Sequence, residues 1–174
     1  MPEIDPRWWL GQGVSLMALA LCVVAFASRR DDRLFVLLLF ANVAFATQFA
    51  LFQSWVAAGI SALIVLRIVL VRRYPGHVGI MAGMLLATLA IAVPTWSGPQ
   101  DIPALLAGLV GTYGMFMLRG LAMRAMLALA AFCWIVSNLL AGSLGGTLAE
   151  SLIFVTNVIT MWRLRRDPAW RQSP

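Results

Sequence analysis

Polar side chains interrupt the apolar stretch from Trp134 to Asn157, which is otherwise hydrophobic enough to lie in a bilayer. Lipid offers no hydrogen-bond partners, so each polar group at that depth needs a protein partner, water or a ligand. The stretch therefore contains the first candidates for a binding site. Its polar members are Asn138, Ser143, Thr147, Glu150, Ser151, Thr156 and Asn157.

Arg67 and Asn157 are the candidates best suited to hold a solute. Each lies about 12 residues into its apolar run, so the two should sit at similar depth and face one central cavity. The planar guanidinium of Arg67 could bind a carboxylate or phosphate, and the Asn157 amide could add a neutral hydrogen bond. The alternative for Arg67 is that its long side chain reaches the cytoplasmic headgroups, because Arg72 is only five residues away.

Glu150 is the acidic residue that lies well inside an apolar run. It could bind a proton or a cationic solute and so couple transport to an ion. The alternative is a structural role, because Thr147 followed three residues later by Glu150 is the pattern of a capping box at a helix start.

Four further side chains could line the same site. Gln48 and Asn138 either face a cavity or join helices by hydrogen bonds. Gln12 lies between two glycines that permit close helix approach, and it could have either role. Trp134 could stack on a ring-shaped solute, although a tryptophan packed in the core or against lipid is the commoner case.

Catalytic and metal-binding patterns are absent from the sequence. It has no hydrolase elbow, zinc motif, phosphate loop or pair of intramembrane carboxylates. The single histidine, His77, lies beside Pro75-Gly76 at the edge of a run, and the two cysteines do not form a C-x-x-C pair. We therefore expect neither an enzyme, nor a bound metal, nor a cofactor.

Composition identifies the elements that position these residues. Hydrophobic residues make up 61% of the 174 residues, and charged residues only 11%. Soluble domains carry about 25% charged residues, so the chain is expected to be an integral membrane protein. The net charge of +6 comes from short arginine clusters between apolar runs, which favours contact with membrane lipid over binding of nucleic acid.

The apolar runs predict an all-α fold with seven membrane-spanning helices. Breaks between them occur at Phe52–Trp55, at Pro75-Gly76, at Pro94–Pro99 and at the glycine-rich segment 142–146. The first run is full length, so it is expected to be a retained anchor rather than a cleaved signal. The expected helices cover residues 8–28, 34–52, 55–71, 78–95, 103–118, 123–141 and 147–162.

Arginine placement predicts the orientation of the chain. With seven crossings, eleven of the thirteen arginines fall on one side of the membrane, and Arg7 falls on the other with Glu3, Asp5 and Asp101. The positive-inside rule then places the amino terminus outside and the carboxyl terminus, including the tail 167–174, in the cytoplasm.

Internal similarity predicts two repeats within one membrane domain, residues 1–174. Shifting the chain by 90 residues without a gap aligns Gln48 with Asn138, and Arg67 with Asn157. Three-helix units 8–73 and 103–166 would then be parallel repeats joined by a connector helix, 78–95, in a 3+1+3 arrangement.

Three motifs resemble a known family. The sequences W-L-G-Q-G-V from Trp9, G-L-A-M-R from Gly120 and A-G-S-L-G-G-T-x-x-E from Ala141 are similar to those of the YgjV family of bacterial inner membrane proteins. The resemblance implies a location in the bacterial inner membrane but no reaction. Where that family is expected to carry histidine, this chain has Gln48, which argues against a histidine-dependent proton relay there. The 3+1+3 organisation also resembles SWEET and PQ-loop transporters.

Two functions compete at this point. The first is a SWEET-like transporter or facilitator of a small polar solute, which could be anionic, that works by rocking of the two units. The second is a non-transporting membrane protein that binds lipid or a partner protein. With either function the chain could form a homo-oligomer through a small-residue motif such as Gly79-x-x-x-Gly83. A cavity beside Arg67 and Asn157 would favour the first.

Overall fold

The computed structural model describes residues 6–27 and 31–166, and this part of the chain is all helical. The predicted all-α fold is confirmed, and the predicted tail 167–174 lies outside the described residues. A short 3-10 turn, Pro99–Asp101, precedes α5. The helices are α1 (Pro6–Ala27), α2 (Asp31–Leu51), α3 (Trp55–Arg73), α4 (Val78–Thr95), α5 (Ile102–Met117), α6 (Gly120–Leu140) and α7 (Leu144–Arg166).

The helices are built to lie in lipid. Five of them, α1, α3, α4, α6 and α7, are long and apolar enough to cross a membrane. The apolar part of α2 is shorter, Val36–Leu51, and α5 has 16 residues, which rise about 24 Å at 1.5 Å per residue. Large hydrophobic side chains such as Leu86 and Val93 are exposed on the bundle. Such a surface is stable in a bilayer and not in water.

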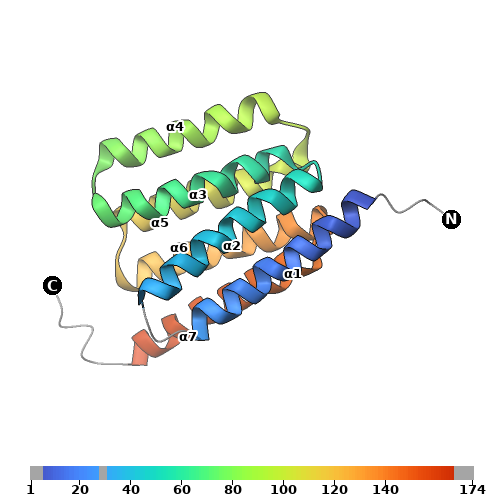
Figure 1. Ribbon diagram of the computed structural model, residues 1–174. Helices are drawn as coiled ribbons and strands as arrows, with labels where there is room; N and C mark the ends of the chain where they lie inside the picture. The colour runs from blue at the N-terminus through green and yellow to red at the C-terminus, as the bar shows by residue number, and fades with distance from the viewer. Residues whose placement is uncertain (1–5, 28–30, 167–174) are drawn as a thin grey trace.

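The bundle consists of two rows of three helices (Figure 1). One row is α1-α2-α3 and the other is α7-α6-α5, with α1 packed on α7 and α3 packed on α5. Helix α4 lies at the edge, where it packs against α3 and α5 (Figure 1). A half-turn about an axis parallel to the helices would exchange the rows in this arrangement. The two-repeat organisation predicted from the sequence stays a prediction.

The turns after α2 and α6 are built alike. Each ends its helix with a residue of positive φ, Gln53 (φ 59) or Gly142 (φ 72), and in each the following serine N–H donates to the carbonyl five residues back, at 2.9 Å. This is the Schellman pattern of a helix end. The positive-φ residues of the two turns are 89 residues apart, one fewer than the 90-residue shift used on the sequence. If the two units are superimposed on these turns, Arg67 corresponds to Thr156 instead of Asn157.

The sequence predicted that the whole glycine-rich segment 142–146 forms the break between two helices, and this prediction is wrong. Gly142 takes the left-handed conformation, and α7 begins two residues later at Leu144. The next two glycines are helical and mark close helix approaches. A Cβ on Gly145 would lie 2.4 Å from the carbonyl carbon of Ser15, and a Cβ on Gly146 would collide with the Asn138 side chain.

Arginines gather at the end of the bundle where α3 and α7 finish, which we call the arginine-rich end. Its described members include Arg72, Arg73, Arg119, Arg163, Arg165 and Arg166. The opposite end, where α1 begins and the α2–α3 and α6–α7 turns lie, is called the N-terminal end. It holds Arg7 and Asp101. The segregation by ends is the pattern that the sequence predicted.

Candidate functional site

Gln48 and Asn138 meet between the two rows, near the ends of α2 and α6. The Gln48 Nε2 donates to Asn138 Oδ1 at 2.7 Å, and Asn138 Nδ2 donates to the Trp134 carbonyl at 2.9 Å. Both side chains are buried, and Gln48 Oε1 has no hydrogen-bond partner among the described residues. The pair therefore joins the two rows, and it leaves one amide oxygen unsatisfied in a low-dielectric interior.

Breaking this amide pair should weaken the contact between the rows. We expect Gln48→Leu and Asn138→Leu each to destabilise the protein by about 1–2 kcal/mol, because each leaves a buried amide without its partner. The double variant should cost less than the sum of the two single variants. Thermal unfolding in detergent measures the cycle, and strict additivity would show that the hydrogen bond contributes nothing.

Gln12 fastens α1 to the turn between α6 and α7. Its Nε2 donates to the Gly142 carbonyl, and its Oε1 accepts from the Leu144 backbone N–H at 3.2 Å. Both ends of the amide are thus occupied by backbone groups. Of the two roles open to Gln12 in the sequence, the structure gives it the structural one.

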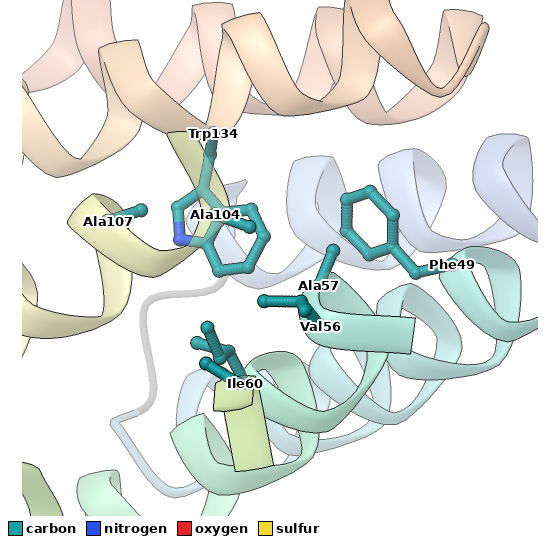
Figure 2. Close-up of a cluster of buried hydrophobic side chains, with 8 residues drawn as sticks. Phe49, Val56, Ala57, Ile60, Ala104, Ala107 and Trp134 are labelled. Carbon is teal, nitrogen blue, oxygen red and sulfur yellow. The ribbon is translucent and has the colours of Figure 1, made fainter. Parts of the chain in front are cut away.

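Trp134 fills the core between the rows (Figure 2). Its ring lies 5.6 Å from that of Phe49, centroid to centroid, and both belong to a buried cluster with Ile60 of α3 and Ala104 of α5. A tryptophan packed on all sides has no free face on which a solute ring could stack. In this conformation Trp134 is a packing residue.

The Arg67 side chain is buried against α5. Its Nη1 donates to the Gly108 carbonyl and to Thr112 Oγ1, each at 3.3 Å, and the residue is 7% exposed. The guanidinium lies beside Gly111, six residues before the end of α5, just as Arg67 lies six residues before the end of α3. Because the side chain is buried at this level and bonded to α5, the alternative that it reaches the headgroups is wrong.

A narrow cleft lies beside the Arg67 guanidinium, between α3, α4 and α5. Its polar lining comes from Arg67, Thr88 and Thr112, and its apolar lining includes Ile60 and Met84. The space between its atoms amounts to ≈ 150 Å³, but no part of it admits a water-sized sphere. The buried Nε of Arg67 has no hydrogen-bond partner among the described residues. The guanidinium is therefore only partly satisfied by this part of the chain.

Asn157 does not share this cleft, contrary to the expectation of one central cavity. It is buried between α6 and α7, where its Oδ1 accepts from Arg124 at 3.5 Å and its Nδ2 donates to the Ile153 carbonyl at 3.0 Å. The helical rise placed Arg67 and Asn157 at similar depth, but the direction of each side chain separates them. The structure does not bring the two residues into one site.

Glu150 lies inside α7, so the capping-box interpretation is wrong. The helix starts at Leu144, and Ser143 Oγ accepts from the Gly146 N–H at 3.0 Å at that start. Glu150 follows Gly146 by four residues and so shares the helix face that meets Asn138. It is half-buried, and its side chain forms no hydrogen bond or salt bridge within the part of the chain that the structure describes.

Open space in the bundle is found at its N-terminal end. A hollow of ≈ 280 Å³ lies against Arg7, Gln53 and Trp55, and a second of ≈ 250 Å³ lies between Trp8, Gln53 and the end of α6. A third, of ≈ 30 Å³, is lined by residues that include Ser54, Asp101 and Ser137. The second and third hollows border both rows. The Trp134 cluster lies between these hollows and the Arg67 cleft.

Sequence reasoning missed Thr88, Thr112 and Arg124 as partners in these sites. Each threonine lies in an apolar run, where a hydroxyl commonly bonds to its own helix, and both do so here. Arg124 was counted among the arginines of a connection. The one available signal was the glycine stripe Gly108, Gly111 and Gly114, since glycine permits another helix, or an arginine side chain, to approach closely.

Comparison with known proteins places the chain in a family. The family model described as "Imp-YgjV: Bacterial inner membrane protein" matches residues 9–168. The chain is also 26% identical over 162 residues to "Inner membrane protein YgjV" of Escherichia coli (strain K12), covering 91% of this chain and 88% of the relative. No solved structure matches. With its bundle of apolar helices, the chain is a multi-pass bacterial inner membrane protein and belongs to the Imp-YgjV family.

Proposed function

We propose that the protein carries a small polar solute across the bacterial inner membrane, with Arg67 as the binding residue and Glu150 as the coupling group. The observation that supports this most directly is the state of these two charges. Arg67 is buried and its Nε has no partner among the described residues, while the half-buried Glu150 forms no salt bridge with it there. Charges that serve only structure are normally paired and fully hydrogen-bonded when buried.

The arrangement of the rows supports movement of one unit against the other. If 8–73 and 103–166 are parallel repeats, a half-turn exchanges α1, α2 and α3 with α5, α6 and α7. That operation exchanges the α1–α7 contact with the α3–α5 contact and maps the α2–α6 contact onto itself. Rocking about such an axis, as in SWEET-type transporters, would connect the hollows at the N-terminal end with the interior.

The proposal includes an orientation of the chain in the membrane and a process without a covalent reaction. The arginine-rich end faces the cytoplasm, so the amino terminus is outside and the carboxyl terminus inside. The reaction is movement of a solute without covalent change, so the protein is not an enzyme. The solute and the surrounding lipid are its partners.

Flux measurements test the proposal. Purified protein in liposomes should raise the uptake of at least one member of a panel of small anions, zwitterions and sugars. Arg67→Ala should remove that uptake. Arg73→Ala changes an exposed arginine on the same helix and should leave it intact. Absence of flux for every solute would refute transport, and equal flux in all three proteins would refute Arg67 as the binding residue.

A second function, that of a non-transporting membrane protein, is supported by the closed interior of the bundle. The interior between the rows is closed at Trp134, and the cleft beside Arg67 admits no water-sized sphere. A non-transporting protein that binds lipid or a partner protein would have such an interior, and so would a transporter in an occluded state. Native mass spectrometry separates the two, because bound lipid or a stable homo-oligomer together with zero flux would favour the non-transporting protein.

A further inference from the structure

We propose that the cleft between α3, α4 and α5 is a binding site for a small carboxylate, and that α4 is the helix that opens it. The proposal rests on the proposed function and locates its solute site. It differs from the prediction made from the sequence, in which the solute lay between the two three-helix units and α4 only connected them.

The charge of the cleft selects an anion. Among the described residues that line it, Arg67 is the charged one, and none is a carboxylate. Only Nη1 of the guanidinium has hydrogen-bond partners there, so Nε and Nη2 keep donors that are not used by the described residues. Two neighbouring N–H groups of a guanidinium match the two oxygens of a carboxylate.

Hydroxyl groups on two other helices complete the donor set. Thr112 Oγ1 accepts from Arg67 and donates to the Gly108 carbonyl at 2.7 Å, and Thr88 Oγ1 donates to the Met84 carbonyl at 2.9 Å. A hydroxyl that donates to its own helix can rotate to donate to a bound oxygen, and it then loses the hydrogen bond to its helix. The cleft thus presents a cation and two adjustable hydroxyls in otherwise apolar walls.

Helix α4 forms one wall of the cleft, and the connections before and after it allow the helix to change its tilt. It packs on α3 and α5 and stands at the edge of the bundle (Figure 1). Glycines of positive φ lie in both connections, Gly76 (φ 75) before α4 and Gly98 (φ 151) after it. Glycine adopts a wide range of backbone angles, so these two positions can absorb a change in helix tilt. An outward tilt would widen the cleft on the side of Met84 and Thr88.

Thiol labelling tests the site without requiring flux. In a Cys22→Ala/Cys133→Ala background, Thr88→Cys places a thiol in the cleft, and Leu89→Cys places one on the next residue, which is exposed on the bundle surface. The protein in phosphatidylcholine nanodiscs is treated with sulfonatoethyl methanethiosulfonate, an anion, or with its trimethylammonium counterpart. Rates are divided by those of each reagent with a free thiol.

The expected result is that the Thr88→Cys variant reacts and prefers the anionic reagent by about tenfold, the effect of a nearby unit charge in a partly wet site. Adding Arg67→Gln should abolish the preference, and adding Arg67→Lys should retain it. Sodium lactate should slow the reaction compared with sodium chloride at equal ionic strength. The Leu89→Cys variant should remain unreactive. If the Arg67→Gln variant does not fold, the preference and the protection by lactate still decide.

Other outcomes overturn the proposal. An unreactive Thr88→Cys variant, or a reactive one without charge preference, would mean that the cleft is closed or that Arg67 does not govern it. Protection by phosphatidylglycerol nanodiscs but not by lactate would assign the site to lipid headgroups and refute a solute site. Flux without labelling of the Thr88→Cys variant would refute the cleft and leave transport standing. Labelling that lactate slows, without any flux, would support the cleft as a carboxylate site and refute transport.

Discussion

Replacing Gly145 by alanine is expected to lower the free energy of unfolding by about 3 kcal/mol, the upper part of the range for overpacked cores. The added Cβ would lie 2.4 Å from the carbonyl carbon and 2.5 Å from the carbonyl oxygen of Ser15. Both are backbone atoms of α1, so no side chain can rotate away, and α1 must separate from α7. The loss should appear although alanine favours helix by about 1 kcal/mol over glycine.

Gly13→Ala provides the matched control. Gly13 lies on α1 near the same contact, and nothing stands within 4 Å of its missing Cβ. This variant should be neutral or slightly stabilising. Unfolding can be followed by the reactivity of Cys22, which is 1% exposed in the folded protein. Equal thermal stability of the two variants would show that α1 and α7 do not approach each other as closely as described.

Trp134→Ala is expected to destabilise the protein by about 3 kcal/mol, at the lower end of the range for buried aromatic residues. The large indole contacts Phe49 and the α3–α5 core, and its removal leaves a cavity between the rows (Figure 2). In lipid the transfer term is small, because lipid tails are as apolar as the core. The lost dispersion contacts remain, and they set the expected value.

Two further variants make the tryptophan prediction specific. Trp9→Ala removes a tryptophan that is 59% exposed and should change thermal stability little. Trp134→Phe should recover about half of the loss, since a phenyl ring fills part of the cavity. A Trp134→Ala protein as stable as the wild type, with altered solute uptake, would contradict the packing role and restore solute stacking.

The helices were predictable from the sequence because local signals set their ends. Apolar runs with few charges determined the count, and proline and glycine determined the breaks, so the expected 78–95 run matches α4. The α6–α7 turn shows where this reasoning stops. One glycine, Gly142, was enough to end α6, and the next two entered α7 because their small size was needed against α1 and α6. The requirement for small residues comes from packing against other helices, so it cannot be predicted from the local sequence.

The candidate site was predictable in its residues but not in its grouping. Buried polar positions such as Arg67, Gln48 and Asn138 stand out in apolar runs, because lipid makes each of them costly. Their partners depend on side-chain direction and on which helices are neighbours. Arg67 therefore bonds to α5 and Asn157 to α6, although their depths agree. The two turns are 89 residues apart, and a shift of 90 residues without a gap could not detect this difference of one residue.

The contact of Gln12 with the α6–α7 turn has a consequence for biosynthesis. The Gln12 amide bonds to backbone groups that lie 130 and 132 residues later in the chain. At about 5–20 residues per second, synthesis of that segment takes on the order of ten seconds. During this interval the first helix lacks both backbone groups that satisfy its amide in the folded protein. Any chain that ends before Gly142 stays in that state.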